Sequence, residues 1–360
     1  GTGTGRYSWA GSNNTDQNDV VAKFDHQLTN ADSLMGRIFF DDSGTYVPNN
    51  LGLLAAVNDS RIQSYVLNHK RIFGASLVND FRFAFNRQNL SADNDIPEKL
   101  NALEYIPGRG YGVLAPGGIA GIATGSTEPR FWTQNIFEYI DDGVLSKGSH
   151  TIKFGGIAKR IRYNGFSAAR YRGEYQFQNL QTFLQGIPTR YEAAFVFAGV
   201  RGLRQWLYGM YFQDDWRVTP RLTLNLGLRY EFTTVPTEAF GRLANLRGQY
   251  DKQVVVGDPL WENPSLKNFA PRIGFAYDPF GDGKTSIRGG GGIFYDQLLP
   301  LYYRDSPFRI LPFQQRIFVT PQNLATALNV PQGTTVIRSE EHTSELQSHL
   351  NLVCRLLLEK

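Results

Sequence analysis

The strongest constraint on the fold is a period-two alternation of apolar and polar residues, repeated in segments of about ten residues. A period of two is typical of a β-strand whose two faces meet different environments. The clearest segment is 222–233, with Thr223, Asn225, Arg229 and Glu231 on its polar face. Its apolar face consists of Leu222, Leu224, Leu226, Leu228, Tyr230 and Phe232.

The pattern predicts ten strands, joined by connections that alternate between short and long. The strands are expected at about 20–28, 33–41, 61–71, 76–88, 133–145, 150–163, 205–217, 222–233, 270–278 and 285–296. The long connections are 42–60, 89–132, 164–204 and 234–269. Short turns at one end and long loops at the other are typical of an outer-membrane barrel. A secreted β-sandwich or propeller, the alternative, has no reason to place every long loop at one end.

The expected fold class is therefore all-β. It is a transmembrane antiparallel up-and-down β-barrel, incomplete, with about ten strands of a larger barrel. The longest apolar run lies near 53–57, too short for a membrane-spanning helix. We expect residues 1–19 to be a cut N-terminal edge or loop, and 20–337 to form the barrel fragment.

Composition disfavours most chemical functions. The net charge of +4 comes without a Lys/Arg cluster, so we expect no nucleic-acid partner. His26, His69 and His150 are isolated, which predicts no metal site, and nothing indicates a cofactor. Adjacent acidic residues such as Asp214 and Asp215 point to opposite faces of a strand and cannot act as an acid/base pair. We expect no enzyme activity.

The sequence of the C-terminal segment 338–360 indicates that it does not belong to the natural protein. Residues 338–349 resemble the in-frame translation of a common short-read sequencing adapter. We therefore expect 338–360, which includes the single cysteine Cys354, to be an artefactual tail. Its leucine spacing predicts an amphipathic helix over 344–360.

Residues 209–232 read GMYFQDDWRVTPRLTLNLGLRYEF. This segment resembles the barrel of TonB-dependent outer-membrane transporters, and 25–40, 147–160 and 268–296 also resemble their Oar-like branch. The resemblance implies a multi-pass protein of a Gram-negative-type outer membrane, with outer-membrane lipid around it. It also implies uptake of an unidentified extracellular ligand, powered by the TonB complex through an N-terminal plug region outside this chain.

Two other functions remain open: a passive porin-like channel, and a surface adhesion or structural barrel. The best candidate for ligand contact is the glycine-rich loop 89–132, because aromatic and arginine side chains there suit capture of a sugar, peptide or chelate. The candidate contact residues are Tyr105, Arg109, Tyr111, Arg130 and Trp132.

Overall fold

The computed structural model describes residues 5–319, except 123, 124, 126, 249, 258, 262–265 and 306–308. The expected tail, 338–360, and its helix lie outside the described residues. None of the helices in the described part of the chain has the length and apolar character needed to cross a membrane.

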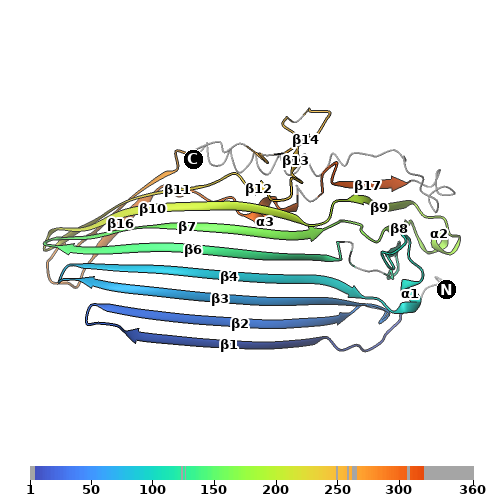
Figure 1. The fold of residues 1–360 in the computed structure, drawn as a ribbon, viewed down its shortest axis with the longest axis horizontal. Helices are drawn as coiled ribbons and strands as arrows, with labels where there is room; N and C mark the ends of the chain where they lie inside the picture. Colours follow the sequence, from blue (N-terminus) through green and yellow to red (C-terminus); the bar gives the residue numbers. More distant parts are fainter. Residues whose placement is uncertain are drawn as a thin grey trace.

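Ten long strands form one antiparallel sheet, the wall sheet, in which each strand pairs with the next along the chain (Figure 1). They are β1 (Asn14–Gln27), β2 (Asp32–Pro48), β3 (Ala55–Phe73), β4 (Leu77–Asp95), β6 (Arg130–Lys147), β7 (His150–Ser167), β10 (Arg201–Thr219), β11 (Leu222–Thr233), β15 (Phe269–Tyr277) and β16 (Ile287–Gly292). The short strand β12 (Thr237–Glu238) adds to β10. Because β1 and β16 stay unpaired edges among the described residues, the sheet is open. The expected incomplete antiparallel barrel is confirmed.

Most wall strands are longer than the alternation predicts. β2 and β3 pair from Asp32 with Arg71 to Pro48 with Ala55. This corrects the expected long loop 42–60, which is reduced to a connection at 49–54. A 19-residue strand such as β3 is about 60 Å long, whereas a bilayer needs only about 9–11 residues. The strands therefore continue well past a bilayer at the end opposite the short turns.

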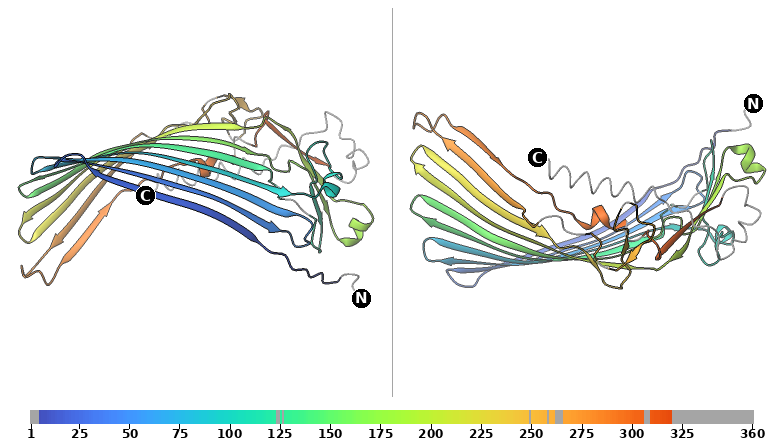
Figure 2. Two further views of the ribbon diagram at one scale, coloured as in Figure 1. Left: turned by 60° about the horizontal axis from the view of Figure 1, so that its bottom comes forward. Right: turned by 90° about the horizontal axis from the view of Figure 1, so that it is seen from above.

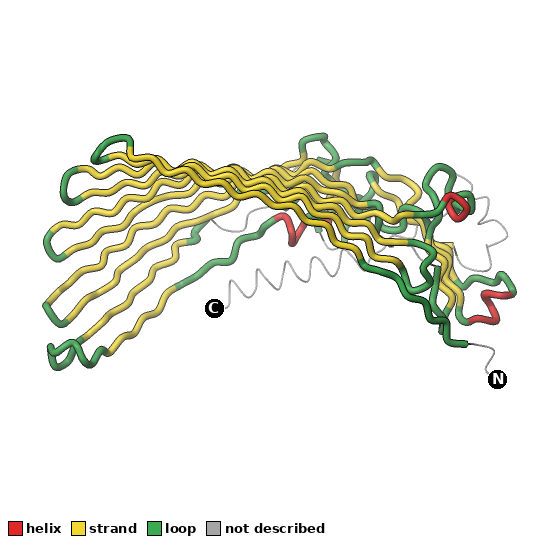
Figure 3. The backbone as a smooth tube through the Cα atoms, turned by 90° about the horizontal axis from the view of Figure 1, so that it is seen from below, coloured by secondary structure: helices red, strands yellow, loops and turns green. Residues whose placement is uncertain are grey.

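The two faces of the wall sheet differ as expected. Figures 2 and 3 show one curved sheet with a short helix, α3 (Pro300–Tyr303), on its concave side. Along β10, Leu203, Gln205 and Leu207 are buried on that side, whereas Met210 and Phe212 are more than half exposed on the other. The apolar residues of β11 share the convex face with Met210 and Phe212. That face is the one a bilayer would cover.

Polar side chains on the concave face pair across strands. Asp215 accepts hydrogen bonds from Lys153 Nζ (2.7 Å), Gln213 Nε2 (2.9 Å) and Asn225 Nδ2 (2.7 Å). Further along, Lys159 pairs with Glu138 at 3.0 Å. These pairs compensate part of the charge on the polar concave face.

A second sheet, the end sheet, forms from segments expected to be loops. Its order is β17 (Gln314–Val319), β9 (Arg190–Phe197), β8 (Glu174–Phe177) and β5 (Val113–Pro116), with β5 and β8 parallel. It lies at the end of the wall sheet opposite the short turns (Figure 1). Long connections that are far apart in the sequence are therefore joined into one unit.

Three helices and one further hairpin complete the described elements. The helices are α1 (Glu98–Asn101), α2 (Leu180–Leu184) and α3, and the hairpin is β13 (Ala244–Asn245) with β14 (Val255–Val256). Asn179 caps α2 by accepting from the Thr182 backbone N–H, and Thr182 Oγ1 in turn accepts from the Asn179 N–H. This reciprocal cap stabilises the helical turn that the sequence of 179–184 indicates.

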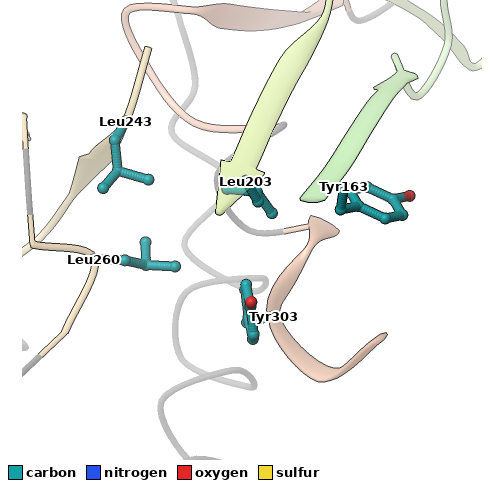
Figure 4. Packing of buried hydrophobic residues seen from close by; sticks show 5 residues of the cluster. All are labelled: Tyr163, Leu203, Leu243, Leu260 and Tyr303. Carbon is teal, nitrogen blue, oxygen red and sulfur yellow. The ribbon is translucent and has the colours of Figure 1, made fainter. Parts of the chain in front are cut away.

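A hydrophobic cluster holds α3 against the concave face. Tyr163 of β7 and Leu203 of β10 pack with Leu243, Leu260 and Tyr303 (Figure 4). The cluster therefore connects the wall sheet to two long connections at the end that carries the end sheet.

Glycines in the loop 89–132 allow close approach of β5 to β8. A Cβ at Gly117 would collide with the carbonyl of Gln178, and one at Gly112 with the carbonyl of Gly173. Gly117→Ala is therefore expected to destabilise the end sheet by about 1–3 kcal/mol. Hydrogen exchange over 113–117 and 174–177 measures the loss. Gly36→Ala, where a Cβ meets nothing within 4 Å, is the control and should leave exchange unchanged.

The turn 278–286 is held by its own carboxylate. Asp278 Oδ1 accepts from the N–H of Gly281 at 2.8 Å, and Oδ2 from that of Gly283 at 2.9 Å. Both glycines have φ of 71°, which other residues rarely adopt. The GDGKT segment at 281–285 is therefore a tight turn held by Asp278.

These backbone N–H groups hold the pKa of Asp278 below its usual value. Because the folded pKa is depressed, the ionised Asp278 stabilises the turn at pH values above its unfolded pKa of about 3.9. This stabilisation is lost as the pH falls through the folded pKa. We expect an acid-tolerant protease to cut the turn only below about pH 4. Asp278→Asn should be cut at every pH, whereas Asp282→Asn should behave like the wild type. A wild-type turn that is cut equally at pH 6 and pH 3 would contradict this account.

Candidate functional site

Two of the candidate contact residues, Tyr105 and Tyr111, are in ring contact beneath the end sheet. Their ring centroids are 5.6 Å apart, and Tyr105 is 4.9 Å from Tyr175, which in turn is 4.5 Å from Tyr191. Tyr111 is only 3% exposed. Burial raises the pKa of the hydroxyls of Tyr105 and Tyr191, so both stay protonated. These rings form a packed support for the sheet.

Arg109 joins the loop 89–132 to the connection between β7 and β10. Its Nη1 donates to the carbonyls of Tyr171 (3.0 Å) and Ala194, and its guanidinium lies 4.9 Å from the Tyr171 ring centroid. Arg172 Nε in turn donates to the Arg109 carbonyl at 3.0 Å. Desolvation lowers the pKa of Arg109, and the two carbonyls replace part of its lost hydration. Arg109 therefore fixes the relative position of two connections.

Arg130 and Trp132 lie elsewhere, at the start of β6 in the wall sheet. Arg130 pairs with Glu128 at 3.5 Å and lies 5.8 Å from the Trp132 ring centroid. Arg304, in the α3 segment, lies 5.0 Å from the same ring. The indole thus faces two guanidinium groups on the concave side, below the end sheet. The five candidates are split between the underside of the end sheet and the mouth of the concave surface.

A buried carboxylate in the end sheet was not a sequence candidate. Glu192 of β9 is fully buried, and three arginines surround it: Arg170 at 3.5 Å, Arg190 at 3.2 Å and Arg316 in direct contact. Arg170 also pairs with Glu174, the cross-strand neighbour of Glu192, at 2.7 Å. No local pattern in the sequence indicates this cluster, because its members lie in the segment before β8, in β9 and in β17.

The residues that hold α3 in place were also missed. Gln205 of β10 donates to the carbonyls of Thr234 and Leu298, both at 3.1 Å, and accepts from the Tyr303 hydroxyl at 3.0 Å. The only signal in the sequence was a polar Gln on the face of β10 that is otherwise apolar near its start. In the described part of the chain, no group of three or more His, Cys, Asp or Glu is placed to hold a metal ion.

Comparison with known proteins finds a matching family and a partial relative. The family model described as an outer membrane beta barrel domain matches residues 1–352. The TonB-dependent transporter Oar of Myxococcus xanthus is 25% identical over 225 residues, which are 59% of this chain and 18% of that protein. The chain therefore spans less than a fifth of the length of this relative.

Solved structures also match part of this chain, and two of them are receptors. The ferric-catecholate import receptor Fiu of E. coli K12 is 12% identical with a TM-score of 0.44, covering 74% of this chain and 41% of its own. The alcaligin receptor FauA of Bordetella pertussis is 11% identical with a TM-score of 0.39, covering 74% of this chain and 33% of its own.

Proposed function

This chain belongs to the outer membrane β-barrel domain family, and from that premise we propose that it forms part of the wall of a TonB-dependent transporter. Its short turns then face the periplasm and the end sheet faces the exterior. The similarity to the transporter of Myxococcus xanthus supports this reading. In the proposed function, the transported substrate is not changed chemically.

The observation that carries the proposal is the assembly of the long connections above a polar concave wall. The end sheet joins the segments on either side of β6 and β7, and α3 is fixed inside the curve by Gln205 and Tyr303. Such an arrangement suits a receptor that collects a ligand at the exterior and delivers it into the lumen. We propose that TonB acts through a plug region outside this chain.

Transport is tested with cells that produce the full-length protein. The probes are fluorescent oligopeptides, fluorescent maltooligosaccharides and radiolabelled ferric citrate. We expect one of them to accumulate in the periplasm, and a protonophore or loss of TonB to abolish its accumulation. Accumulation that persists without energy would indicate a passive porin-like channel. Surface retention without uptake would indicate an adhesin, and no retention above cells lacking the protein would contradict ligand capture.

For ligand contact, we propose that Arg130 and Trp132 touch the ligand, while Tyr105, Arg109 and Tyr111 support the end sheet. Arg130 and Trp132 share the concave side, whereas Phe131 between them points outward and is 41% exposed. Trp132→Ala is expected to weaken capture of the accumulated probe about tenfold, since an arginine–aromatic contact contributes about 1–2 kcal/mol. Phe131→Ala is the matched control, and an equal loss in both variants would contradict the assignment.

A further inference from the structure

A group of arginines occupies the convex, lipid-facing side of the wall near its outer end. Arg87, Asn135, Arg162 and Arg204 are successive cross-strand partners on β4, β6, β7 and β10, so they form one row. Arg160 lies two residues from Arg162 and shares its face. We refer to Arg87, Arg160, Arg162 and Arg204 as the arginine cluster.

An aromatic row borders Arg87, Arg162 and Arg204 on the side nearer the short turns. Cross-strand partners Tyr65, Phe85 and Phe137 lie in it, with ring centroids 6.1 Å and 4.9 Å apart. Trp206 continues the row on β10, and Arg160 of the cluster occupies the β7 position between Phe137 and Trp206, with its guanidinium 5.1 Å from the Trp206 ring centroid. Aromatic girdles mark the level of the bilayer interface in outer-membrane barrels. The arginine cluster is therefore placed at the depth of the outer-leaflet headgroups.

No carboxylate is in direct contact with the cluster in the described residues, although Glu238 lies near enough to Arg204 to attract it. In the described residues none of its four guanidinium groups forms an ion pair, although Arg61, one row further out, pairs with Asp42 at 3.0 Å. Arg204 donates to the carbonyls of Leu203 (2.9 Å) and Tyr163 (3.4 Å), and Arg87 to Asn135 Oδ1 (3.5 Å). Four neighbouring cations that form no ion pair repel one another, and an external anion between them relieves this repulsion.

We propose that the arginine cluster binds the phosphate groups of a phosphorylated lipid headgroup in the outer leaflet. A guanidinium can donate two parallel hydrogen bonds to a phosphate. The aromatic row below would contact the acyl chains of the same lipid, which supplies the second half of the site. The assignment rests on the membrane placement of the sheet and does not depend on transport.

The test uses the full-length protein in detergent, with native mass spectrometry to count bound lipid. The probes are bis-phosphorylated lipid A, the same lipid after removal of its phosphates, and inorganic phosphate. We expect the wild type to bind lipid A and to bind the dephosphorylated form much more weakly. Arg162→Gln/Arg204→Gln should weaken lipid A binding about thirtyfold, from about 1 kcal/mol for each arginine.

Two control variants separate this effect from charge and folding. Arg37→Gln/Arg82→Gln removes the same charge from the concave face and should bind lipid A like the wild type. Arg162→Lys/Arg204→Lys keeps the charge and should stay within a few-fold of the wild type. Equal binding of phosphorylated and dephosphorylated lipid by the wild-type protein would by itself overturn the proposal, whatever the variants show. Displacement of lipid A by millimolar inorganic phosphate would also overturn it, since the site would then bind free anions.

Discussion

Replacing Glu192 by alanine is expected to destabilise the end sheet by about 3–5 kcal/mol, because the change leaves the surrounding arginines without their shared counter-ion. Glu192 is fully buried and contacts Arg170, Arg190 and Arg316. Hydrogen exchange over 190–197 and 314–319 in the full-length protein measures the effect. The exchange rate should rise more than a hundredfold there, while the rate over 205–217 stays unchanged.

Two further variants test the cause of this loss. Glu192→Gln keeps the volume but removes the charge, and we expect it to lose most of the same stability. Arg190→Gln removes the most exposed of the three arginines, and should cost less than about 1 kcal/mol. If Arg190→Gln were as damaging as Glu192→Ala, the carboxylate would not be the centre of the cluster.

Leu228→Arg is expected to cost about 2–4 kcal/mol of folding free energy in a lipid bilayer. Leu228 is exposed on the convex face opposite Phe212, which lies midway between Trp206 and Trp216 along β10. Those ten residues correspond to about 25 Å once the strand tilt is included, which is the height of an outer-membrane apolar band. Denaturant titration of the full-length protein folded into vesicles measures the cost.

A second leucine on the same face of β11 provides the control for this prediction. Leu222 shares the face of Leu228 but begins β11 at the short-turn end. Leu222→Arg should therefore cost only about 0–1 kcal/mol, and Leu228→Met should be nearly neutral. Similar costs for arginine at 222 and 228 would show that the convex face does not contact a bilayer at this depth.

The sequence predicted the wall sheet well because one side of each strand meets lipid. Alternation marks the centre of most wall strands, including Leu222–Thr233 with no change of bounds, whereas β16 is mostly glycine. It fades at 43–48 and 55–60, where β2 and β3 extend past the bilayer and both faces are wet. Strand ends in this region therefore lie beyond what periodicity can locate.

The end sheet was missed for a different reason. β5 and β8 have four residues each, pair in parallel and lie about 60 residues apart in the chain. No local pattern identifies such a pairing, so Arg109 could be recognised as a loop arginine but not as a connector. The aromatic and glycine content of 89–132 predicts a ligand-binding loop, and the structure shows that Gly112 and Gly117 in it provide close packing.

The pairing of β5 with β8 also limits how these exterior segments can diverge in evolution. An insertion within 113–117 or 174–177 would shift the register of a partner encoded some 60 residues away. The hairpin tip around α2 has no such partner among the described elements, and Leu184 there is 75% exposed. Length changes should therefore accumulate at the tip, while the paired segments keep a fixed length.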